Sequence, residues 1–158
     1  MKSIALLAGL LIVAAILGSA AVDAGAAASQ NINTHGATCK NYNAAQALDI
    51  DYLSYGVRNV STGSRPVICS VERHPVTGAT QAFYVDGTNS AGQATVCTLT
   101  SYNYSGVYQS SVSFSESIAN YDHYATLPTI GYYDYVSLVC TLPPSGLGTL
   151  RGVVALDS

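Results

Sequence analysis

Four cysteines constrain the fold of this chain more than any other sequence feature. They stand at Cys39, Cys69, Cys97 and Cys140, and no two of them form a C-x-x-C pair. A structural zinc site needs such close pairs, whereas an even number of widely separated cysteines in an exported chain is typical of disulfides. We therefore predict two disulfides and no metal site.

Apolar alternation around the cysteines favours one pairing. Three cysteines lie in segments where apolar residues alternate with polar ones, namely 67–71, 97–99 and 136–142. Because side chains of a strand alternate between two faces, these three sulfurs point inward with their apolar neighbours. We favour Cys97 with Cys140, since both lie in well-formed strands, which leaves Cys39 with Cys69. The two other pairings that four cysteines allow stay open.

The N-terminus has the pattern of a signal peptide. Lys2 precedes an uncharged apolar run from Ile4 to Leu17, and small residues follow. This order predicts a signal peptide helix over residues 1–28 with cleavage near 26–28. The alternative is an uncleaved anchor, but the run is shorter than the about 20 residues of a spanning helix. We expect a secreted or periplasmic protein with no stable membrane anchor after cleavage.

Composition narrows the range of partners. Six Lys and Arg residues stand against nine Asp and Glu residues, and charged residues make up 9% of the chain. No basic surface is therefore available for a phosphate backbone, so we expect no nucleic-acid partner. Hydrophobic residues make up 49% and tyrosine occurs 12 times, which favours a folded, β-rich domain. We expect no cofactor, and the oligomeric state does not follow from these features.

Short alternating segments predict an all-β domain. We expect residues 29–38 to be a flexible lead-in and residues 39–158 to form a single β-sandwich domain. Expected strands are 48–57 as one bent strand, 66–72, 81–85, a hairpin of 94–104 and 107–116, 132–142 and 150–156, with turns at 62–64 and 86–87 and an irregular stretch at 120–129. This spacing favours an antiparallel two-sheet sandwich, jelly-roll or Ig-like, stapled by disulfides.

Four segments carry a resemblance to known proteins. They are YGVRN at 55–59, RPVICSVER at 65–73, CTLTSY at 97–102 and VSLVCTLPP at 136–144. In these segments, within about 39–157, the chain resembles small secreted bacterial β-sandwich proteins of unassigned function. The resemblance implies the scaffold and export, and it carries over no catalytic residue.

A cluster of tyrosines is the main functional signal. Five of them, Tyr121, Tyr124, Tyr132, Tyr133 and Tyr135, occur within one short region. Tyrosine offers a flat apolar face and a hydroxyl group, which suits a sugar ring or a protein partner. We predict that these five residues bind a ligand, a glycan or a cell-surface component. The alternative is ordinary packing of tyrosines on a sheet.

Catalytic and metal motifs are weaker. A triad from His123, Asp134 and a serine lacks the G-x-S-x-G turn that exposes a nucleophile. Asp49 and Asp51 point to one strand face rather than into a cleft, and the loop at 86–90 carries too few acidic residues for calcium. The histidines at 35, 74 and 123 are expected in solvated loops. We predict no catalytic residue.

These observations rank three functions. First comes a secreted, non-enzymatic module that binds a glycan or surface component. A structural or protein-interaction role, as an envelope or matrix component or an inhibitor, comes second. A small secreted hydrolase comes third.

Overall fold

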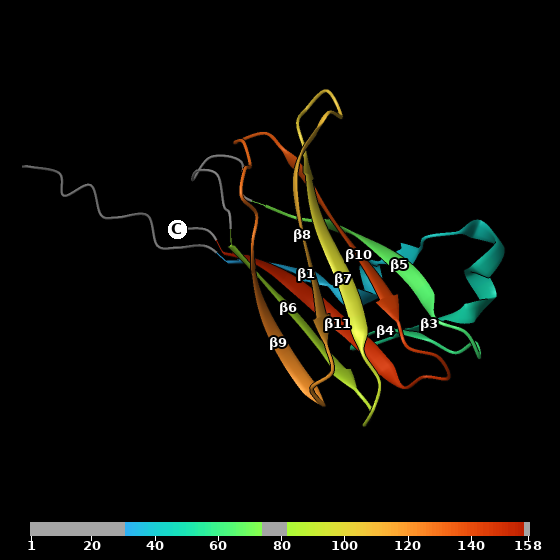
Figure 1. The fold of residues 1–158 in the computed structure, drawn as a ribbon. Helices are drawn as coiled ribbons and strands as arrows, with labels where there is room; N and C mark the ends of the chain where they lie inside the picture. The colour runs from blue at the N-terminus through green and yellow to red at the C-terminus, as the bar shows by residue number, and fades with distance from the viewer. Residues whose placement is uncertain (1–30, 74–81, 157–158) are drawn as a thin grey trace, which may run out of the picture.

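The computed structural model describes residues 31–73 and 82–156, and within them it contains eleven strands and two short 3₁₀ helices (Figure 1). The predicted signal peptide lies outside the described residues. The strands form two antiparallel sheets, as expected. Among the described residues, no helix combines the length and apolar character needed to cross a membrane.

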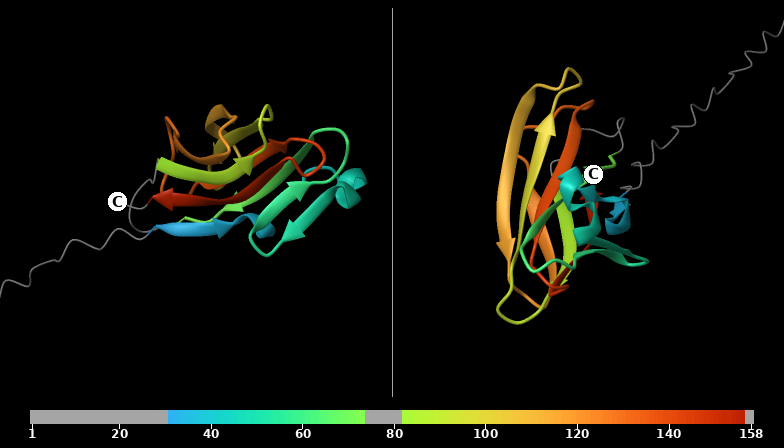
Figure 2. Two further views of the ribbon diagram at one scale, coloured as in Figure 1. Left: turned by 90° about the horizontal axis from the view of Figure 1, so that it is seen from below. Right: turned by 90° about the vertical axis from the view of Figure 1, so that its right-hand side faces the viewer.

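The first sheet has six strands. Its order is β3 (Ile50–Leu53), β4 (Gly56–Asn59), β11 (Gly148–Leu156), β6 (Ala82–Asn89) and β9 (Asn120–Thr126), and β1 (Ile32–His35) also pairs with β11. On the side of β11 away from β6, β4 pairs with its first half and β1 with its second half. Both can be followed beside β11 in the left view of Figure 2.

The second sheet has five strands. Its order is β2 (Lys40–Asn41), β5 (Arg65–Val71), β10 (Tyr135–Leu142), β7 (Thr95–Tyr102) and β8 (Tyr108–Glu116). The expected hairpin is present as β7 and β8, with Gly106 at φ 77° in the connection. Positive φ costs glycine little, so this residue type suits the turn.

Apolar side chains from both sheets meet in one core. Phe83 and Val85 of β6 are fully buried, and so are Leu99 of β7 and Leu138 of β10. In each of these strands buried and less buried residues alternate, as the period of two predicts. The outer faces carry mainly tyrosine, serine, threonine and charged residues, with a few aliphatic ones such as Val96 and Ile68.

Both disulfides form with the favoured pairing. Cys39 bonds to Cys69, Cys97 bonds to Cys140, and all four side chains are buried. Cys97 and Cys140 are direct cross-strand partners on β7 and β10, and Cys39 directly precedes β2, which pairs with β5. Both disulfides thus bond neighbouring segments of the five-stranded sheet.

Five local expectations are wrong. The strand expected over 132–142 begins only at Tyr135, as β10, and Tyr132 and Tyr133 lie in a turn. Residues 32–38 are no flexible lead-in, because β1 pairs with β11 and η1 (Gly36–Thr38) follows it. Residues 48–57 form the end of η2 (Ala44–Asp49) and most of the β3–β4 hairpin instead of one bent strand. Residues 86–87 lie inside β6, and residues 120–126 form β9. At 32–35, 86–87 and 120–126 pairing with a distant strand overrides the local signal, whereas at 48–57 a turn at 54–55 folds the segment into a local hairpin.

Candidate functional site

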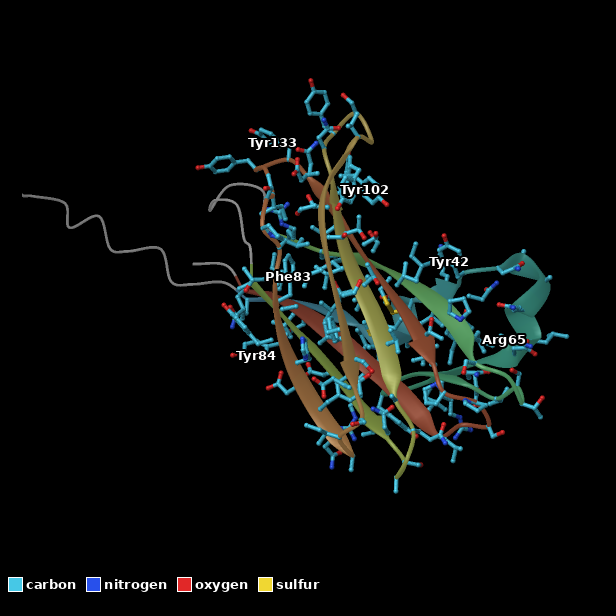
Figure 3. The ribbon with its side chains drawn as sticks, viewed as in Figure 1. Tyr42, Arg65, Phe83, Tyr84, Tyr102 and Tyr133 are labelled. Atoms are coloured by element: carbon cyan, nitrogen blue, oxygen red, sulfur yellow. A yellow bond between two sulfur atoms is a disulfide. The ribbon has the colours of Figure 1, made fainter. Side chains whose placement is uncertain are left out.

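The turn before β10 carries two exposed predicted tyrosines. The Gly131 amide donates to Asp134 Oδ2 at 2.6 Å, and Ser101 Oγ of β7 donates to the same oxygen at 3.1 Å. The Asp134 carboxylate therefore closes the turn and attaches it to β7. Between these anchors Tyr132 and Tyr133 stand 58% and 74% exposed, and Figure 3 shows Tyr133 at the end of the molecule.

Arg73 braces the same turn from the end of β5. Its Nη1 donates to the carbonyl of Asp134 at 2.8 Å and to that of Gly131 at 3.3 Å. Bonds from two different strands thus fix the backbone that presents Tyr132 and Tyr133. A braced turn loses little conformational entropy when a ligand binds, which favours recognition.

A hollow of about 480 Å³ lies beside this turn. Its side chains include four exposed tyrosines, the bracing arginine and a serine: Tyr104, Tyr132, Tyr133, Tyr135, Arg73 and Ser70. Three of the five predicted tyrosines therefore come together here. Tyr104 joins them from the β7–β8 connection, which the sequence did not place near them.

A second hollow of about 550 Å³ adjoins the first on the exposed face of the five-stranded sheet. Its lining side chains come from four strands and η1, and they are Thr38, Lys40, Ile68, Ser70, Tyr102, Tyr135 and Ser137. Ser70 and Tyr135 line both hollows. Tyr135, which is 65% exposed, therefore stands between them.

Strand register aligns side chains of one kind across this face. Tyr135 of β10 pairs with Tyr102 of β7, which pairs with Tyr108 of β8. The rings of Tyr102 and Tyr108 meet edge to face at 6.4 Å. The next row consists of hydroxyl residues, namely Ser70, Ser137, Thr100 and Ser111. The face thus offers aromatic surface beside hydrogen-bonding groups.

Tyr121, in contrast, lies in the core. It is 4% exposed, and it faces the interior from β9 directly opposite Gly87 of β6. A Cβ atom at Gly87 would lie 2.1 Å from the Tyr121 hydroxyl oxygen, so the ring occupies the space that a side chain would take. Burial raises the pKa of Tyr121 to about 12. Tyr121 is therefore not available as a surface contact.

Tyr124 is exposed, but it belongs to the other sheet. It lies on the outer face of β9, where its ring packs on Tyr84 of β6 with centroids 5.3 Å apart. Neither hollow on the five-stranded sheet includes it. The five predicted tyrosines are thus divided between one surface, the core and the opposite sheet.

The acidic residues form a different pair from the one that the sequence suggested. Asp49 forms an ion pair with Arg65, and Asp51 forms one with Arg58. The carboxyl groups that do meet are those of Asp86 and Asp122, cross-strand partners on β6 and β9. Burial and the Asp122 carboxyl raise the pKa of Asp86 to about 6, against an opposing contribution from Arg151.

Substitution of Asp86 by asparagine should therefore change the pH dependence of stability. In the unfolded chain this carboxyl titrates near 3.8, below its folded pKa of about 6. Between these values the unfolded chain has released a proton that the folded protein retains, so the free energy of unfolding falls as pH rises. Between pH 4 and 7, we expect the free energy of unfolding of Asp86→Asn to rise by about 1 kcal/mol relative to that of the wild type. This value is discounted because the carboxyl group is partly exposed and therefore screened by solvent.

Urea unfolding at four pH values between 4 and 7 measures this gain. Asp51→Asn is the matched control, since the Asp51 carboxylate is held by Arg58 rather than by a second carboxyl group. A constant difference between Asp86→Asn and the wild type across the range would contradict the prediction.

No catalytic triad forms from the residues that the sequence suggested. His123 is not a loop residue: its ring stacks on Phe114 at 3.8 Å, and its Nδ1 contacts Glu116 Oε1. Asp134 is engaged in its turn, as described above. His35 is exposed and its Nδ1 accepts from the Ala37 amide, and His74 lies outside the described residues.

The suggested calcium loop does not form either. Asn89 is buried in β6, where its Oδ1 accepts from Thr95 Oγ1 at 2.7 Å. Within the ranges 31–73 and 82–156, no group of three or more His, Cys, Asp or Glu side chains could hold a metal ion.

No family model and no curated protein matches the chain. A solved structure that is similar to it is TmCBM61, a carbohydrate-binding module, in complex with β-1,4-galactotriose. The superposition has a TM-score of 0.41 and 13% sequence identity, and it covers 80% of this chain and 86% of the other. At this level the similarity concerns the β-sandwich scaffold and assigns no role to a residue.

Proposed function

We propose that this protein is a secreted, non-enzymatic module that binds a glycan or a surface component. Its site is the exposed turn and strand end that carry Tyr132, Tyr133 and Tyr135. The observation that carries the proposal is the gathering of these three tyrosines with Tyr104 around one hollow. Exposed aromatic side chains on a backbone that is braced from two strands are typical of a recognition site.

The chemistry of the hollow suits a sugar. A sugar ring has an apolar face of C–H groups and a rim of hydroxyl groups. Tyrosine side chains can cover the first and hydrogen-bond to the second, with little loss of side-chain entropy. Ser70 adds a further hydroxyl group to the lining. A concave site with much aromatic surface and a few polar groups is the usual form of a small-ligand site.

The disulfides support a location outside the cytoplasm. Two buried disulfides persist in oxidising compartments, which are the bacterial periplasm and the extracellular space. Together with the predicted signal peptide, they support a secreted or periplasmic protein whose partner is a cell-surface or environmental component. The low content of basic residues leaves nucleic acid out of the proposal.

A protein partner is the second candidate, because tyrosine is also enriched in protein interfaces. Tyr104, Tyr132 and Tyr133 stand out from the end of the sandwich and could enter pockets of a partner. This candidate needs no hollow, whereas a glycan site uses one.

A double substitution tests the proposal. We expect Tyr132→Ala, Tyr133→Ala to weaken retention on a panel of insoluble cell-wall and plant polysaccharides at least 10-fold, because two stacking rings are lost. Tyr124→Ala is the matched control, since it removes an equally exposed tyrosine from the opposite sheet. Affinity electrophoresis and pull-down of the oxidised mature protein supply the measurement.

Each outcome has a definite meaning. Equal weakening by the control variant would show that the turn is not the site. Failure of the wild type to bind any polysaccharide, combined with specific capture of an envelope protein that the double variant loses, would replace the glycan by a protein partner.

A further inference from the structure

We infer that the ligand is an extended polysaccharide segment that occupies both hollows and crosses Tyr135, rather than a single sugar held at the turn. This inference rests on the proposed function and adds the length and path of the ligand. It assigns a binding role to Tyr102 and Ser137, which line the second hollow.

Continuity of the two hollows is the first observation. Both are lined by Ser70 and Tyr135, and the volumes are about 480 and 550 Å³. Tyr135 projects from the first residue of β10, so its ring is reached from either side. A ligand that stacks on this ring can therefore extend into either hollow.

The dimensions of the second hollow require a ligand of several sugar residues. Lys40, at its far end, shares a row with Ile68 and Val139, and Val139 lies four residues beyond Tyr135 on β10. With about 3.4 Å per residue and about 4.8 Å between strands, Tyr135 and Lys40 lie roughly 16 Å apart along a diagonal of the sheet. The first hollow extends the path beyond Tyr135 to the turn. One sugar ring cannot contact both ends.

Aromatic and hydroxyl groups lie in neighbouring rows along this path. Tyr135 and Tyr102 offer aromatic surface, and the hydroxyl groups of Ser70 and Ser137 follow in the next row. Each ring of a polysaccharide likewise presents an apolar face and hydroxyl groups, which match the aromatic and the hydroxyl side chains.

Charge further defines the ligand. Lys40 is the charged side chain in the lining of the second hollow, and the lining residues include no acidic side chain. Lys40 is exposed, so its charge acts through solvent, where it disfavours a positive ligand and favours a negative one. With Arg73 and Asp134 in the lining of the first hollow, the two hollows together favour an uncharged or acidic polysaccharide over a cationic one.

Calorimetric titration with oligosaccharides of increasing length tests the inference. The probes are β-1,4-linked gluco-, manno-, galacto- and xylo-oligosaccharides of two to six residues. For those that bind, we expect affinity to rise at least 10-fold from two residues to six. In Tyr102→Ala this rise should be lost, and Tyr102→Phe should restore the rise because it keeps the ring.

A second variant tests the second hollow independently of Tyr102→Ala, in case that variant does not fold. Ser137→Phe fills the second hollow without removing any side chain that packs, and it should also abolish the rise with length. Thermal unfolding confirms that each variant is folded.

The outcomes separate the two proposals. Disaccharide binding that depends on Tyr132 and Tyr133 but does not strengthen with length would retain the proposed function and overturn this inference. A rise with length that both Tyr102→Ala and Ser137→Phe preserve would overturn the path across the sheet. Absence of binding at every length would count against the inference and the glycan function together.

Discussion

Joint replacement of Cys97 and Cys140 by alanine is expected to lower the free energy of unfolding by about 4 kcal/mol. The disulfide closes a loop with a sequence separation of 43 residues, so its removal restores a large amount of conformational entropy to the unfolded chain. Natural domains are stable by only about 5–15 kcal/mol, so the variant should lose a large part of its stability. Urea unfolding at pH 7 measures the loss.

The other disulfide supplies the comparison. Cys39–Cys69 spans 30 residues, for which the same entropy relation predicts a slightly smaller loss of about 3.7 kcal/mol. The two double variants should therefore have similar stability, and each should retain the remaining disulfide when free thiols are titrated. A loss below about 1 kcal/mol for Cys97→Ala, Cys140→Ala would mean that the entropy relation does not describe this protein.

Substitution of Gly87 by alanine is expected to destabilise the protein by about 3 kcal/mol, at the upper end of the range for overpacked cores. The added Cβ would lie 2.1 Å from the Tyr121 hydroxyl oxygen and 2.5 Å from the backbone carbonyl oxygen of Thr149. The tyrosine ring is buried and the carbonyl belongs to β11, so neither can move without disturbing the sheet. Thermal and urea unfolding measure the effect.

Gly63→Ala is the matched control for Gly87→Ala. There the nearest atom to an added Cβ is Arg65 Nη1 at 3.1 Å, which ends a long side chain and is not part of the backbone, so a shift of a few tenths of an ångström relieves the contact. The same methyl group should therefore change stability by less than about 0.5 kcal/mol, as is usual for surface substitutions.

A double-mutant cycle identifies the cause of the destabilisation. Tyr121→Ala alone removes a buried ring and leaves a cavity. If the Gly87–Tyr121 contact is responsible, the combined variant should be more stable than the sum of the single effects predicts. Additive effects would instead attribute the cost of Gly87→Ala to the Thr149 carbonyl.

The Gly87–Tyr121 contact also shows why part of the site could not be predicted from the sequence. An Asp-Gly pair is typical of a turn, and a tyrosine near other tyrosines suggests a surface. Once β6 and β9 are paired, both residues turn to the interior and fit each other. The same register brings together the carboxyl groups of Asp86 and Asp122, which are far apart in the sequence.

The turn at Tyr132 and Tyr133 was expected as the start of a strand over 132–142, whereas β10 begins only at Tyr135. Glycine and aspartate flank the two tyrosines in the sequence, and turn chemistry of this kind leaves the residues between them exposed. Their neighbour Tyr135 could be placed on a strand by alternation alone. The contributions of Tyr104 and Arg73 could not, because they reach the turn from the β7–β8 connection and from the end of β5.

What the sequence by itself determined is therefore local: the alternation that builds strands, the inward phase of three cysteines and the β7–β8 hairpin. Each depends on the stereochemistry of a few adjacent residues, and the favoured disulfide pairing followed from that phase. What the tertiary structure decided is which strands are neighbours and in what register. That choice moves Tyr121 into the core and Tyr124 to the opposite sheet, and it aligns Tyr135 with Tyr102. Register is set by packing between segments distant in the chain, and a shift of one residue exchanges the two faces of a strand.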